Sequence, residues 1–127
     1  MDKKPISQWS VGELIDSPEF RHELSEQISM EIGHHDKMKA EAIKVGMRLQ
    51  RAPIQRLRER GLLDVENVIA CYKLILNKQL SPSYFSAAER EYIKLLCNVA
   101  SWRTIAKVQQ REKAEAEAEK GGDGYAS

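Results

Sequence analysis

Apolar residues recur at helical spacing along most of the chain, and this repeat restricts the fold more than any other feature. Counted at about 100° per residue from Phe20, the side chains of Leu24, Ile28 and Met38 fall in one sector of a helical wheel. The phase is kept beyond Gly33, and two independent helices would share it only by chance. The pattern therefore predicts one helix over about 18–50, either straight or kinked at Gly33.

Capping residues and further apolar stripes predict the other helices. Pro53 ends the first helix and can begin a short one that stops at Gly61. Asp64 caps a third helix, and Ser86 with Glu89 forms a capping box that opens a long last helix over about 87–119. No segment shows convincing strand alternation. The predicted fold class is all-α, a small helical bundle with two long helices and two or three shorter ones.

A single domain is expected, because 127 residues with 42% apolar side chains can bury one core. We assign residues 1–120 to this domain, with 106–120 as an exposed helical extension and 121–127 as a flexible tail. The extension is rich in Ala, Glu and Lys, which favour helix but bury little. No apolar run approaches the roughly 20 residues that span a bilayer, and we expect a cytoplasmic protein without membrane contact.

Charge reverses sharply within the first half of the chain. Residues 1–36 carry 3 basic and 8 acidic side chains, whereas residues 37–60 carry 8 basic and 2 acidic ones. The overall charge of +1 hides this separation. On the wheel of the predicted first helix, the basic side chains form a ridge opposite the apolar stripe, and more follow on the short helix. The candidate binding residues are Lys37, Lys44, Arg48, Arg51, Arg56, Arg58 and Arg60.

Two kinds of partner suit this ridge. Several phosphates of a nucleic acid could be neutralised there, with salt-dependent binding. Against nucleic acid, the isoelectric point is only about 7.8, and no aromatic residues interleave with the basic ones for base stacking. The segment 54–65 has the outline of a helix-turn-helix, but its second helix is too apolar to reach base edges. A protein partner or solvent is therefore favoured over nucleic acid.

The sequence does not predict a catalytic or metal site. Glu31 and His34 have the Glu-x-x-His spacing of di-iron bundles, but such sites require the motif twice. Cys71 and Cys97 lie in apolar helical patterns without a CxxC motif, so we expect two small buried side chains. We predict no catalytic residue, no metal, no cofactor and no small-molecule substrate.

The expected function is that of a non-catalytic interaction protein, a small regulator, inhibitor or adaptor that binds a protein partner through charged helical faces. The alternative is a nucleic-acid-binding accessory protein that uses residues 37–60. A homodimer is also expected, because antiparallel pairing of two 18–50 helices would set acidic halves against basic halves.

Overall fold

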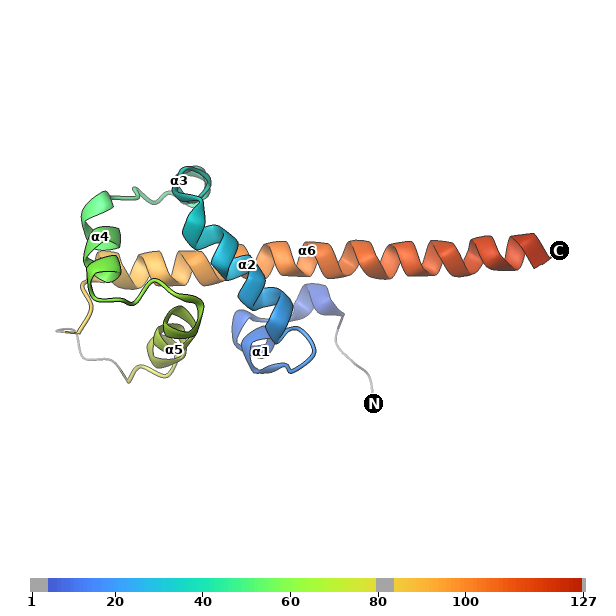
Figure 1. Ribbon diagram of the computed structural model, residues 1–127, viewed down its shortest axis with the longest axis horizontal. Coiled ribbons are helices and arrows are strands. Elements are labelled where there is room, and N and C mark those ends of the chain that lie inside the picture. Colours follow the sequence, from blue (N-terminus) through green and yellow to red (C-terminus); the bar gives the residue numbers. More distant parts are fainter. Residues whose placement is uncertain (1–4, 80–83, 127) are drawn as a thin grey trace.

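The computed structural model describes residues 5–79 and 84–126, with side chains except at 35 and 120–126, and each regular element in it is helical (Figure 1). The predicted all-α fold class is confirmed. In chain order the elements are η1 (Ile6–Gln8), α1 (Val11–Asp16), α2 (Arg21–Gly33), α3 (His35–Lys44), α4 (Arg51–Glu59), α5 (Val65–Leu76) and α6 (Ala87–Ala126).

The first half of α6 is the axis of the bundle. Figure 1 shows the shorter helices gathered around this half, and α2 and α5 pack most extensively on it. Ile93, Leu96, Val99 and Ala100 are fully buried there. Trp102, an aromatic residue of the same half, is 51% exposed. Burial of the apolar side of α6 against several helices is the main source of stability in such a bundle.

The two predicted caps, at Ser86 and Asp64, are confirmed by hydrogen bonds, and a third cap precedes α1. The Ser86 hydroxyl accepts from the backbone N–H of Glu89 at 3.2 Å, and the Glu89 carboxylate accepts from the backbone N–H of Ser86 at 3.4 Å. Ser10 and Glu13 make the same reciprocal pair before α1. The Asp64 carboxylate accepts from the backbone N–H of Asn67 at 2.9 Å. Each cap satisfies amides that have no partner within their own helix.

The helix predicted over 18–50 is not continuous, and it breaks directly after Gly33, where the sequence analysis allowed a kink. It is divided into α2 and α3 at His34, whose φ of −123° and ψ of 70° are not helical, and Figure 1 shows α3 turned away from the direction of α2. The bend keeps the side chains of Met38 and Ala42 in the core, where both are fully buried. An apolar stripe that bends around a core keeps its phase, so shared phase does not require a straight helix.

Glycine ends α3 well before residue 50. Gly46 has a φ of +74°, the backbone N–H of Met47 donates to the carbonyl of Ala42 at 2.8 Å, and that of Gly46 donates to the carbonyl of Ile43 at 3.1 Å. These two bonds form a Schellman motif, in which a left-handed residue closes a helix. Gly61, with a φ of +70°, ends α4 in the same way, as predicted.

The second half of α6 projects beyond the bundle (Figure 1). Val108 is still buried, whereas all side chains from 109 to 119 are exposed. The helix continues to Ala126, six residues beyond the boundary expected at 120, and Ser127 lies outside the described residues. The flexibility of 121–127 stays a prediction. Within 5–79 and 84–126, no helix is long and apolar enough to cross a membrane.

Candidate functional site

The basic ridge predicted for one helix is distributed over three elements. Lys37 and Lys44 belong to α3, Arg48 lies in the loop after it, and the remaining candidates belong to α4 or to the residue that follows it. Because α3 and α4 are separate helices, these side chains do not share one straight face. The structure therefore sorts the seven candidates into those with acidic partners and those without.

Arg56 and Arg60 face the start of α6. The Arg56 Nε lies 3.4 Å from Oε1 of Glu89, and the Arg60 Nη1 lies 3.3 Å from its Oε2. Glu89 is 5% exposed, so both guanidinium groups pair with a nearly buried carboxylate. Arg60 also donates to the carbonyl of Tyr84 at 2.9 Å and lies 4.8 Å from the centre of its ring. These two arginines hold α4 against α6 and are structural residues.

The two lysines are set apart from α4. Lys44 lies 3.2 Å from the carboxylate of Glu41 one turn earlier in α3. Lys37 borders a separate depression next to Gly33, His34 and Asp36. Neither lysine therefore extends the basic surface of α4.

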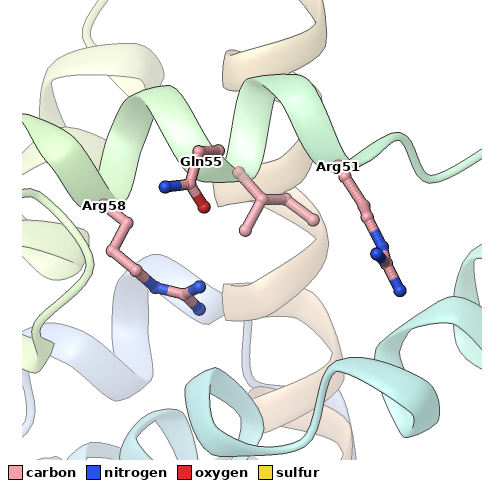
Figure 2. Close-up of a pocket in the computed structure, with 4 residues that line it drawn as sticks. Arg51, Gln55 and Arg58 are labelled. Atoms are coloured by element: carbon pink, nitrogen blue, oxygen red, sulfur yellow. The ribbon is translucent and has the colours of Figure 1, made fainter.

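Arg51 and Arg58 flank a hollow on the opposite side of α4. The hollow has a volume of about 250 Å³ and is lined by Arg51, Ile54, Gln55 and Arg58, which we call the α4 hollow. Figure 2 shows the two guanidinium groups extending to the same side of the helix, with Gln55 between them along the chain. These residues are spaced i, i+3, i+4 and i+7, so they share one helix face.

No ion pair engages Arg51 or Arg58 within the described part of the chain. The nearby acidic residue Glu59 accepts instead from the Gln55 amide, at 3.3 Å. Burial raises the pKa of the Tyr92 phenol, and the positive charge of Arg58 opposes that rise. Arg48 likewise forms no ion pair among residues 5–79 and 84–126, and it lines an adjacent hollow of about 200 Å³ with Met47, Pro53 and Tyr92.

The residues that line the α4 hollow are of the types that recognise anions. Guanidinium groups present fixed N–H donors that match carboxylate and phosphate oxygens, and Ile54, which is 4% exposed, forms the apolar floor between them. The two thiols of the chain are elsewhere, buried and free, as the sequence predicted. Burial raises the pKa of Cys97 to about 12, so this thiol is protonated at neutral pH. Among the described residues, no group of three His, Cys, Asp or Glu side chains could hold a metal ion.

One polar cluster in the core was missed by the sequence analysis. Glu31 is 1% exposed, accepts from the Gln27 amide at 2.8 Å and pairs with Arg103 of α6, which also lies 3.3 Å from Glu41. Arg103 thus joins α2, α3 and α6 across the bend at His34. On the helical wheel, Gln27 and Glu31 fall within the apolar stripe, and polar residues at such positions require buried partners. Glu31 is therefore engaged with Arg103 and Gln27.

Comparison with known protein families, curated proteins and solved structures finds no match to this chain.

Proposed function

We propose that this chain is a non-catalytic interaction protein, a small regulator, inhibitor or adaptor that binds an acidic surface of a protein partner through the α4 hollow. One observation carries the proposal. Arg51 and Arg58 face the same hollow, and neither makes an ion pair with any described residue, although Arg56 and Arg60 nearby both engage Glu89. Guanidinium groups left available in this way are typical of recognition sites for carboxylates.

A protein partner is favoured over nucleic acid by the extent and composition of the site. Arg56 and Arg60 are engaged with Glu89, and Lys44 with Glu41, so the seven candidates do not form a continuous track for a phosphate backbone. The hollow combines two charges with buried Ile54, and none of the described residues that line it is aromatic and able to stack on a base. Mixed apolar and arginine surfaces are common at the centres of protein interfaces.

The proposal includes the cytoplasm as the compartment and requires no cofactor, small-molecule substrate or membrane. The two free, buried cysteines are consistent with a reducing compartment.

The test compares the wild-type chain with a double charge reversal, Arg51→Glu and Arg58→Glu, as bait in pull-downs from extracts of the source cells. Proteins that bind through the α4 hollow should be retained by the wild type and lost by this variant. The matched control is Lys78→Glu with Lys107→Glu, which makes the same change in charge at two exposed positions away from the hollow. The control should retain the same proteins.

Binding of labelled mixed-sequence DNA and RNA is measured in parallel at about 50 and 200 mM salt. Weak binding that both variants share equally would support a protein partner. Strong binding that falls steeply with salt and disappears only in the Arg51→Glu, Arg58→Glu variant would replace the proposal with the nucleic-acid alternative. Loss of the same captured proteins from the control as well would show non-specific charge attraction and contradict the proposal.

A further inference from the structure

The projecting half of α6 carries a face made of three glutamates and one alanine. Glu112, Glu115 and Glu119 are exposed, and with Ala116 they are spaced i, i+3, i+4 and i+7, so they lie along one side of the helix. We call these four residues the acidic face. None of the three carboxylates forms an ion pair with a described residue. Like charges at such spacings destabilise an isolated helix, and a cationic surface would relieve the repulsion.

The neighbouring side of the same helix is balanced. Lys113 and Glu117 are four residues apart and of opposite charge, so they support each other without a partner. The acidic face is therefore a local property of one side of the projecting helix and not the general composition of the segment.

The acidic face matches the α4 hollow residue by residue in one direction. Both surfaces have the spacing i, i+3, i+4, i+7. When the helices run antiparallel, Glu119 lies opposite Arg51 and Glu112 opposite Arg58. The central positions then pair Ala116 with Ile54 and Glu115 with the Gln55 amide. The parallel alignment would instead set Glu115 against Ile54, so the antiparallel register alone satisfies all four positions.

The partner helix must come from another molecule. α4 packs on the first half of its own α6, whereas the acidic face lies on the half that projects away from the bundle as one continuous helix (Figure 1). A helix does not fold back on itself, so the acidic face cannot reach the α4 hollow of its own chain.

We infer that two copies of this chain associate by exchange, the acidic face of each α6 lying antiparallel along the α4 hollow of the other. One such contact involves four residues from each helix, far fewer than the 20–30 per partner of a stable interface. A two-fold arrangement makes the contact twice, so eight residues of each chain take part and the assembly closes as a weak dimer. The inference rests on the proposed function, since the same α4 hollow is used, and names a second copy as a partner.

A charge-swap experiment tests the exchange directly. Sedimentation is measured for the wild-type chain, for the hollow variant Arg51→Glu with Arg58→Glu, and for the extension variant Glu112→Arg with Glu119→Arg. The wild type should dimerise, with weaker association at higher salt. Each variant alone brings like charges together at both contacts and should weaken dimerisation about tenfold or more.

Mixing the two variants provides the decisive outcome. In the mixed pair, the α4 hollow with reversed charge on one chain meets the acidic face with reversed charge on the other. The unaltered acidic face and the unaltered α4 hollow also meet, so both contacts are complementary again. A heterodimer should form at near wild-type concentrations. The matched control for the extension, Glu19→Arg with Glu117→Arg, changes the same charge at exposed sites outside the acidic face and should still dimerise.

Three outcomes would overturn the inference. These are a wild type that is monomeric up to about 100 µM at low salt, variants that dimerise as well as the wild type, and a mixture that fails to associate although both variants keep their helical circular dichroism. None of these results would affect the proposed function if the pull-down still depends on Arg51 and Arg58. Loss of both dependences would remove the α4 hollow as a binding surface altogether.

Discussion

The two sides of α4 use the same residue type for opposite purposes. On one side Arg56 and Arg60 engage the nearly buried carboxylate of Glu89, and on the other Arg51 and Arg58 border a hollow without making an ion pair to any residue in the described ranges. Both roles fall within the ten residues from Arg51 to Arg60. A basic residue of this chain is therefore a candidate for binding a partner only when no carboxylate of the fold pairs with it.

The largest loss of stability should follow from breaking the ion pair of the most buried carboxylate. Arg103→Met leaves Glu31 without its cationic partner in the core, and we expect the free energy of unfolding to fall by about 3 kcal/mol. Urea denaturation measures this loss. The double variant Glu31→Leu with Arg103→Met removes both charges and should recover most of the stability. A single variant as stable as the wild type would show that Glu31 is not desolvated.

A smaller loss is expected where the carboxylate lies at the edge of the core. Glu89→Ala removes the partner of Arg56 and Arg60 together with half of the capping box, and should lower the free energy of unfolding by about 2 kcal/mol. Ser86→Ala removes the cap alone and should lower it by about 1 kcal/mol in the same denaturation assay. Equal losses in the two variants would mean that the arginines add nothing beyond the cap.

A still smaller loss of stability is expected when Arg111 is replaced. It pairs with Glu23 of α2 where α6 leaves the bundle, and the exposed guanidinium is well hydrated without that partner. The pKa of Arg111 is raised by its hydrogen bond to Glu23, so the pair favours the charged guanidinium. We expect Arg111→Ala to destabilise the fold less than Glu89→Ala, with the difference resolved by thermal unfolding. A loss larger than that of Glu89→Ala would reverse the ranking of exposed and buried pairs.

The smallest effect on stability should come from the α4 hollow itself. Arg51→Ala with Arg58→Ala removes no internal ion pair, so the free energy of unfolding should change by less than about 0.5 kcal/mol. The same variant should lose the proteins captured through this surface. Stability and binding would then respond to different sides of one helix. A substantial loss of stability would assign these two arginines to the fold instead.

Helix boundaries could be predicted from the sequence where a cap of neighbouring residues sets them. A change in the direction of the chain between two helices was predicted less well. Ser86, Asp64 and Gly61 marked boundaries that the structure confirms, because caps depend on neighbours only a few residues away. The break at His34 was foreseen only as an optional kink at Gly33, because both sides of the bend bury the same apolar stripe. Gly46 was a readable stop signal, since a glycine after a basic last turn is typical of a helix end.

The candidate site was predicted in its residues but not in its grouping. Arg51 and Arg58 were among the seven basic candidates. Nothing near them in the sequence shows that Arg56 and Arg60 form ion pairs with Glu89, about 30 residues later. Ion pairs between distant segments depend on how helices pack, and a helical wheel does not contain that information. The same limit hid the pairing of Glu31 with Arg103.

The length of α6 has a consequence for how molecules of this protein meet. Arg58 lies close to Tyr92, and Glu115 is 23 residues further along the same straight helix, which corresponds to about 35 Å. Positive charge near one end and negative charge on the projecting end give the protein a large electric dipole moment. Such a dipole orients two approaching molecules antiparallel, with the negative end of each toward the positive end of the other, and this orientation raises the fraction of productive collisions at low ionic strength.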